Sequence, residues 1–153
     1  MEKRYLSDIK WKDQRIVSFN HSEDRWECSI NSFANEAITY YNGVLHIYPA
    51  NGANCAESYK ATKEDFNALK EVILKNPAFV CCGDIHIFNL DHIVKLEKRP
   101  NCLYVDCRYG LYGVDIKNKE DVKEFVMAMK RKWKKAIDDF DQNDTLNDEE
   151  DCL

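Results

Sequence analysis

The sequence predicts an α+β protein built from antiparallel sheets or meanders, with one helix in the middle of the chain and a longer one near its C-terminal end. Three observations support this fold class. Segments rich in β-branched and aromatic residues recur at short intervals along most of the chain. Asn42-Gly43 separates two of these segments, and both residues tolerate the positive φ angles of a type I′ hairpin turn. Two other stretches carry apolar residues at every third or fourth position, as amphipathic helices do.

The first half of the chain is expected to hold several strands and the shorter helix. Strands are expected at 14–20, 25–33 and 36–48. Residues 49–61 are small and polar and predict a loop. Thr62 then caps a helix that has Asp65 at its third position. This helix ends at Asn76-Pro77, because a residue before proline avoids the α conformation. Its apolar face is formed by Phe66, Leu69, Val72 and Ile73.

The second half repeats this order of strands followed by a helix. Strands are expected at 78–82, 85–90, 92–98, 102–107 and 111–117. Asn118 is the expected N-cap of the closing helix, whose first turn is acidic and whose end is basic, as the helix dipole favours. Its apolar stripe consists of Val122, Phe125, Val126, Met129, Trp133, Ile137 and Phe140.

The two halves resemble each other in pattern. Lys63-Glu64-Asp65 and Lys119-Glu120-Asp121 each begin a helix that follows a hairpin. Either hairpin–helix units are duplicated, over 14–76 and 78–137, or the same capping chemistry has arisen twice. The stretch from Ile87 to Trp133 is also similar in pattern to half of a PH-like fold, a meander of strands closed by one helix. Neither pattern identifies a family, and we expect residues 1–137 to form a single globular α+β domain.

Charge is distributed unevenly along the 153 residues. The chain has 22 basic and 27 acidic residues and a formal net charge of −5. Residues 138–153 hold eight of the acidic residues and no Lys or Arg, which predicts a disordered acidic tail and leaves 1–137 mildly basic. The apolar content of 44% argues against a wholly disordered chain, and every apolar run is too short to span a membrane.

The seven cysteines are expected to be reduced thiols in a cytoplasmic protein. The N-terminal segment Met1–Tyr5 is charged and lacks the apolar core of a secretory signal. Cys81, Cys82, His86 and His92 lie close together in sequence and offer zinc-ligand chemistry. Adjacent residues of a strand point to opposite faces, however, and cysteine is commonly buried. We therefore predict packing thiols, with no metal and no cofactor.

Familiar catalytic motifs are missing from the sequence. It contains no glycine-rich phosphate loop, no nucleophile elbow and no His-Glu-x-x-His motif. We therefore expect a non-enzymatic protein-binding module of the inhibitor, immunity or adaptor type, engaging a basic partner such as a nucleic-acid-handling enzyme. The expected partner-binding residues are the acids of the tail: Asp138, Asp139, Asp141, Asp144, Asp148, Glu149, Glu150 and Asp151.

Nucleic-acid binding is the first alternative. A basic stretch before the tail would neutralise phosphates, and the acidic tail would act as an internal competitor. Tyr104, Tyr109 and Tyr112 would stack on bases. The basic residues of this stretch are Lys130, Arg131, Lys132, Lys134 and Lys135.

A small-molecule or metal site is the second alternative. Cys55, in the predicted loop, is the best candidate for an exposed thiol. His46, or Cys82 together with His86, would supply imidazole and thiol ligands.

Overall fold

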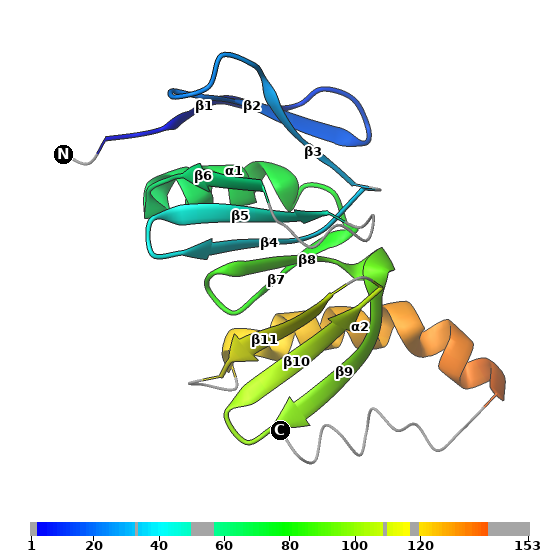
Figure 1. The fold of residues 1–153 in the computed structure, drawn as a ribbon. Helices are drawn as coiled ribbons and strands as arrows, with labels where there is room; N and C mark the ends of the chain where they lie inside the picture. The colour runs from blue at the N-terminus through cyan, green and yellow to red at the C-terminus, as the bar shows by residue number, and fades with distance from the viewer. Residues whose placement is uncertain (1–2, 33, 50–56, 109, 117–119, 141–153) are drawn as a thin grey trace.

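The computed structural model describes residues 3–32, 34–49, 57–108, 110–116 and 120–140, and a five-stranded sheet lies at its centre (Figure 1). The strand order is β6-β5-β4-β8-β7, and every neighbouring pair is antiparallel. The strands are β4 (Asn35–Tyr41), β5 (Val44–Pro49), β6 (Glu57–Lys60), β7 (Phe79–Cys82) and β8 (His86–Asn89). Side chains from the two faces of this central sheet enter two different hydrophobic clusters.

One face of the central sheet is covered by the N-terminal part of the chain. This part is a three-stranded sheet, ordered β1 (Leu6–Trp11), β2 (Ile16–His21), β3 (Cys28–Asn31), which lies above the central sheet in Figure 1. Helix α1 (Lys63–Ile73) packs against β1 and contributes to the same cluster. The largest fully buried side chains of this cluster are Phe19, Ile30, Ile38, Leu45, Ile47, Phe66, Leu69, Ile73 and Ile87.

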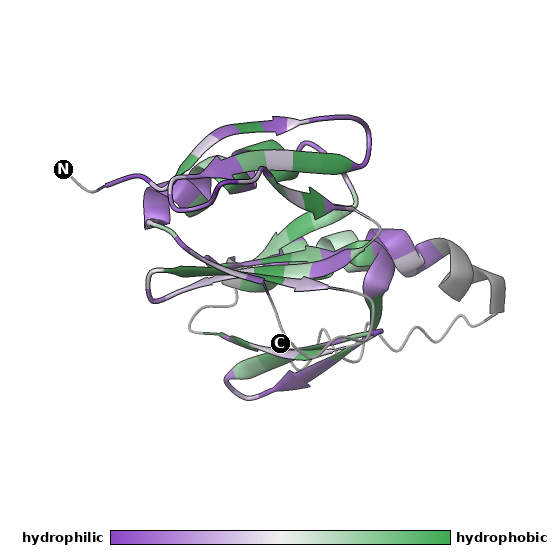
Figure 2. Ribbon diagram, turned by 45° about the horizontal axis from the view of Figure 1, so that its top comes forward, coloured by the Kyte–Doolittle hydropathy of each residue, from purple (hydrophilic) through white to green (hydrophobic). Residues whose placement is uncertain are grey.

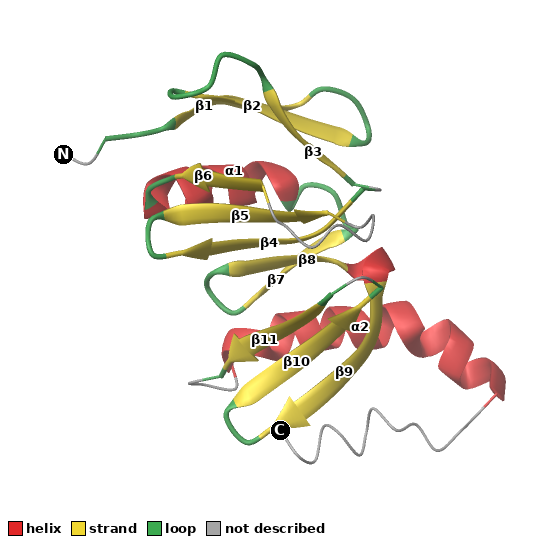
Figure 3. Cartoon of the chain, viewed as in Figure 1, coloured by secondary structure: helices red, strands yellow, loops and turns green. Residues whose placement is uncertain are grey.

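The opposite face is covered by the C-terminal part. After the short 3-10 helix η1 (Leu90–His92) come β9 (Ile93–Arg99), β10 (Cys102–Cys107) and β11 (Leu111–Asp115), which form the lower sheet in Figure 3. Helix α2 (Glu120–Phe140) packs against β7 and completes this layer. From the predicted stripe of α2, Val122, Phe125 and Met129 are buried and Val126 and Trp133 are half-buried against them, while the side chains of Ile137 and Phe140 lie outside the described part of the chain.

The predicted α+β class of antiparallel sheets with two helices is confirmed. Hydrophobic residues run along the strands of all three sheets in Figure 2, whereas the turns at their ends are mostly hydrophilic. In β10 this follows from strict alternation, because Leu103, Val105 and Cys107 are buried while the residues between them are only half-buried. In the described part of the chain, no helix is both long and apolar enough to cross a membrane.

The start of α1 has the predicted cap. The Thr62 hydroxyl accepts a hydrogen bond from the Asp65 N–H at 3.0 Å, and the Asp65 carboxylate accepts one from the Thr62 N–H at 3.0 Å. This reciprocal capping box satisfies two donors at the helix end. The same carboxylate also accepts from the N–H groups of Tyr5 and Leu6 and pairs with Arg4. The cap therefore also anchors the beginning of β1.

The predicted turn at Asn42-Gly43 is confirmed. Both residues have positive φ, 53° and 81°, and Tyr41 pairs directly with Val44 across the hairpin. A two-residue turn fixes the register of both strands. Thr39 is consequently placed opposite His46.

Two strands differ from the sequence prediction. β1 was not predicted, because its alternation is broken at Asp8, which has a φ of 51° within a register shift between Ser7 and Lys10. The prediction of a loop throughout 49–61 was wrong at 57–60, which form β6 by pairing with β5 at the edge of the sheet.

The end of α2 also differs from the prediction. The helix continues through Phe140 and so includes positions 138–140, which the sequence analysis assigned to the acidic tail.

Candidate functional site

A row of polar residues crosses one face of the central sheet. Pairing between neighbouring strands aligns Ser58, His46, Thr39, His86 and Cys82, one residue from each of the five strands. Residues aligned in this way share a face, because side chains alternate along each strand. This polar row borders the part of the face that the C-terminal layer covers, since Cys82 already belongs to its cluster.

Two hydrogen bonds fix the imidazoles of the row. Thr39 Oγ1 lies 3.0 Å from His86 Nδ1, and Ser58 Oγ lies 3.0 Å from His46 Nδ1. The His86 ring also stacks on Phe88, with the two ring centroids 5.9 Å apart. Because a hydroxyl engages Nδ1 in each histidine, Nε2 is the nitrogen left to meet a ligand.

His86 is held in its neutral form. Burial lowers the pKa of His86 to about 4, and the carboxylate of Asp115 opposes this shift only in part. At neutral pH the ring therefore offers hydrogen bonding without a positive charge. Asp115 lies on β11 and His86 on β8, so the effect of the Asp115 carboxylate on the pKa of His86 acts between two different sheets.

A groove of about 590 Å³ opens over the polar row. Its floor comes from β4, β5 and β8, and its walls come from β11 and from the turn between β7 and β8. We call it the His86 groove. Its lining residues are Thr39, Tyr41, His46, Tyr48, Gly83, Asp84, Ile85, His86, Gly113, Val114 and Asp115. Concave sites with a few convergent polar groups are where proteins usually bind ligands.

The lining of the His86 groove is acidic and aromatic. Among the residues that the structure describes, its charged lining residues are Asp84 and Asp115, and none is Lys or Arg. Asp84 is already paired, since its carboxylate and carbonyl oxygens lie 2.9 and 3.2 Å from Lys63 Nζ. Tyr41 leaves 66% of its surface exposed beside the groove. The groove is therefore suited to a cation or a hydrogen-bond donor rather than to an anion.

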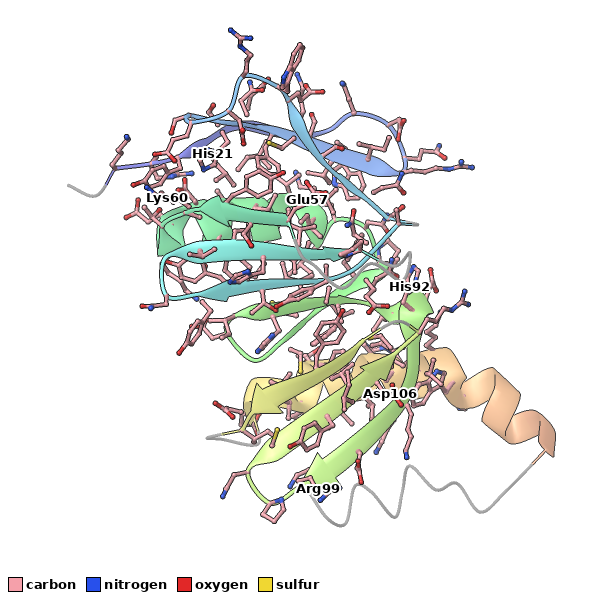
Figure 4. All side chains as sticks on the ribbon, viewed as in Figure 1. His21, Glu57, Lys60, His92, Arg99 and Asp106 are labelled. Atoms are coloured by element: carbon pink, nitrogen blue, oxygen red, sulfur yellow. The ribbon has the colours of Figure 1, made fainter. Side chains whose placement is uncertain are left out.

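The predicted division of the paired cysteines is confirmed. Cys81 packs against the N-terminal cluster and Cys82 belongs to the C-terminal cluster, on opposite faces of β7. Burial, with a smaller effect from Cys81, raises the pKa of the Cys82 thiol, so this side chain is an inert packing group. His92 lies apart on η1 (Figure 4). Within the described ranges, no group of three or more His, Cys, Asp or Glu residues could hold a metal ion. Cys55 lies outside those ranges.

The basic stretch lies on the C-terminal half of α2. Arg131, Lys132 and Lys134 are exposed and Lys130 is half-buried, whereas the side chain of Lys135 is not described. Lys132 forms an ion pair with Asp91 of η1, which occupies part of its charge.

The tyrosines proposed to stack on bases differ in location. Tyr112 is turned inward: its hydroxyl donates to the Glu36 carboxylate at 2.6 Å, and its ring contacts Tyr48 and Phe88 edge-on. These contacts engage Tyr112 within the fold, and its stacking on a base stays a prediction. Tyr104 lies on the outer face of β10, and Tyr109 is outside the described residues. The nucleic-acid interpretation stays a prediction.

The acidic tail is described only at its beginning. Asp138 and Asp139 lie in the last turn of α2, and their side chains are not described. The remaining six predicted binding residues, Asp141, Asp144, Asp148, Glu149, Glu150 and Asp151, lie outside the described residues.

Sequence reasoning missed Thr39 and Asp115 as site residues. The Asn42-Gly43 turn held the signal for the first, because its register places Thr39 opposite His46. Asp115 reaches the groove only through the packing of β11 near the central sheet, which no local pattern indicates.

Comparison with known proteins does not assign a family. No protein-family model and no curated protein matches the chain. Among solved structures, the chain is similar to the LytTr DNA-binding domain of a protein from Bacillus cereus, with 10% sequence identity and a TM-score of 0.49. The match covers 83% of this chain and 98% of that domain. A likeness this distant carries no argument about function, so the site is interpreted from its own residues.

Proposed function

We propose that the chain is a non-enzymatic protein-binding module of the inhibitor, immunity or adaptor type, and that its His86 groove receives a lysine or arginine side chain of a basic partner. The observation that carries this proposal is the composition of the groove. Two carboxylates and two tyrosine rings line it, with no Lys or Arg among the lining residues that the structure describes. Carboxylates and aromatic rings are the groups that bind ammonium and guanidinium ions in proteins.

Within the groove, Asp115 is the principal anion for such a side chain. Asp84 is partly neutralised by Lys63, whereas Asp115 is exposed at the end of β11. The neutral ring of His86 adds a hydrogen-bonding group to the same groove without repelling a cation. A basic side chain would thus meet one charge and several uncharged partners.

The acidic tail would add to the attraction. Its eight acids have the same sign of charge as the groove carboxylates, and like-signed charge over a surface speeds encounter with an oppositely charged partner. We place the interaction in the cytoplasm, where the cysteines stay reduced.

Binding of a fluorescently labelled lysine-rich peptide, followed by fluorescence polarisation, tests the proposal. Asp115→Asn should weaken binding about tenfold, whereas Asp106→Asn, a matched loss of charge on β10 at a residue that does not line the groove, should stay within about twofold. Deleting residues 141–153 should lower affinity mainly at low salt. Equal effects of the two substitutions would show that only net charge matters and would end the assignment to the groove.

We also propose that the hairpin–helix units are duplicated. β4, β5 and β6 followed by α1 have the same order as β9, β10 and β11 followed by α2, which supports this reading. The PH-like description of the second half stays a prediction.

A further inference from the structure

The free edge of β11 borders the His86 groove. β11 stands at the end of its sheet, in the order β11-β10-β9, and no other described strand pairs with it. The Cys107 N–H donates to the Gly110 carbonyl at 2.8 Å, and the Ile116 N–H donates to the Asn101 carbonyl at 3.0 Å. In an antiparallel pair only alternate residues exchange backbone hydrogen bonds with the partner strand. Counting between these two bonds, residues 112 and 114 bond to β10, and residues 111, 113 and 115 direct their N–H and C=O groups away from it.

Two of these outward-directed residues, Gly113 and Asp115, line the groove. Both are exposed, and the absence of a side chain at Gly113 lets another backbone approach closely. The open backbone groups of β11 and residue Asp115 therefore lie at the same border of the groove.

This edge lacks the protection that the edges at β1, β7 and β9 carry. Exposed edges are commonly guarded by lysines, irregular backbone or covering elements. β9 carries Lys95, Lys98 and Arg99, and β1 is interrupted by the register shift near Asp8. β7 packs against α2. β11 contains no Lys or Arg, and its Leu111 is 63% exposed.

Resting on the proposed function, we propose that the occupant of the His86 groove is an extended segment of the partner, which adds to the free edge of β11 as a further strand. A residue of this segment opposite Asp115 would exchange backbone hydrogen bonds with it. Its side chain would lie on the same face as the carboxylate. Charge complementarity assigns lysine or arginine to this position of the partner segment.

A second copy of the chain is a poorer occupant. Antiparallel pairing of two β11 edges about Gly113 would set Asp115 of each copy opposite Leu111 of the other, by the alternation already given. The carboxylate would then lose water without gaining a cation. A basic segment satisfies both the backbone and the charge.

Backbone methylation of a peptide tests strand addition without altering the protein. The probe is a labelled seven-residue peptide in which lysine alternates with threonine. If lysine lies opposite Asp115, the lysine N–H groups face β11 and the threonine N–H groups face solvent. Methylating the lysine nitrogens should weaken binding at least about tenfold, while methylating the threonine nitrogens, the matched control, should change it by less than about threefold.

The outcomes separate the two proposals. If Asp115→Asn weakens binding but the two methylated peptides bind alike, the groove accepts basic side chains and strand addition is wrong. If Asp115→Asn and Asp106→Asn change the affinity for the peptide equally, the proposed function itself is wrong. Loss of binding on lysine methylation alone, with amide chemical-shift changes at residues 111, 113 and 115, would establish the added strand.

Discussion

Asp65→Ala should destabilise the fold more than any other single loss of charge in α1. The carboxylate is fully buried and accepts hydrogen bonds from the N–H groups of Tyr5, Leu6 and Thr62 at 2.9, 3.3 and 3.0 Å. It also pairs with Arg4. Alanine would remove the acceptor for all of these donors at once and break the contact between α1 and the start of β1.

The expected cost follows from the number of donors left without a partner. An unsatisfied buried N–H group costs about 1–3 kcal/mol, and loss of one member of a buried ion pair costs about 3–5 kcal/mol. Arg4 is partly exposed, and water can reach the beginning of β1 once the contact opens. We therefore expect a loss of about 3–5 kcal/mol in the free energy of unfolding, which is below the simple sum of these costs.

Urea denaturation followed by circular dichroism measures this loss. Glu64→Gln is the matched control, because Glu64 is an exposed acid of the same first turn and should cost only about 0.3–1 kcal/mol. A loss below about 1 kcal/mol for Asp65→Ala would refute the view that this carboxylate joins the N-terminal sheet to the helix.

The same carboxylate gives a pH dependence. Burial by itself would raise the pKa of Asp65, but the hydrogen bonds from Thr62, Arg4, Tyr5 and Leu6 outweigh it and hold that pKa below its usual range. A folded-state pKa below the unfolded one adds stability that is complete above about pH 4 and is lost as the pH falls through the folded pKa. Wild-type protein should lose this contribution in acid, whereas Asp65→Ala should not.

Three further predictions concern single residues. NMR titration of His86 should give a pKa of about 4. Because the pKa in the unfolded chain is near 6.5, the free energy of unfolding of the wild-type protein should decrease as the pH falls from about 6.5 to about 4. The His86→Gln variant should lose less stability over the same pH range. Gly43→Ala should cost about 1 kcal/mol in urea denaturation, because φ is 81° and nothing crowds the position, so a neutral result would contradict the turn geometry. In native protein Cys82 should react with a thiol reagent far more slowly than the half-buried Cys102, because burial raises the pKa of Cys82. Mass spectrometry of the modified protein gives the two rates of modification, and comparable rates would contradict the burial of Cys82.

Local chemistry explains how much of the fold could be predicted. The Thr62 cap and the Asn42-Gly43 turn each depend on residues only a few positions apart, so their patterns are legible in the sequence. β6 was missed because its four residues become a strand only by pairing with β5. β1 was missed because the irregularity at Asp8 breaks its alternation.

The site was less predictable than the fold because its residues are far apart in sequence. The hairpin turn brings Thr39 to His46, and that pair could have been read from the register. The hydrogen bond between Thr39 and His86 joins residues 47 positions apart and requires β8 to lie beside β4. Asp115 joins them only after β11 has packed against this face. Predicting the groove from the sequence would therefore require two long-range arrangements, the pairing of β8 with β4 and the packing of β11.

The contrast between neighbouring rows of the same strands is the strongest reason to place function at the His86 groove. Ile47, Ile38 and Ile87 form one cross-strand row and are completely buried, whereas the adjacent row of the same three strands carries His46, Thr39 and His86. A face that served only for packing would gain from apolar residues, because burying an imidazole is unfavourable unless its hydrogen bonds are satisfied. Here the polar residues are kept, hydrogen bonded and left open to a groove beside an unpaired strand edge. Departures from the best packing are expected where a protein binds something, and this one coincides with the acidic lining and the free edge of β11.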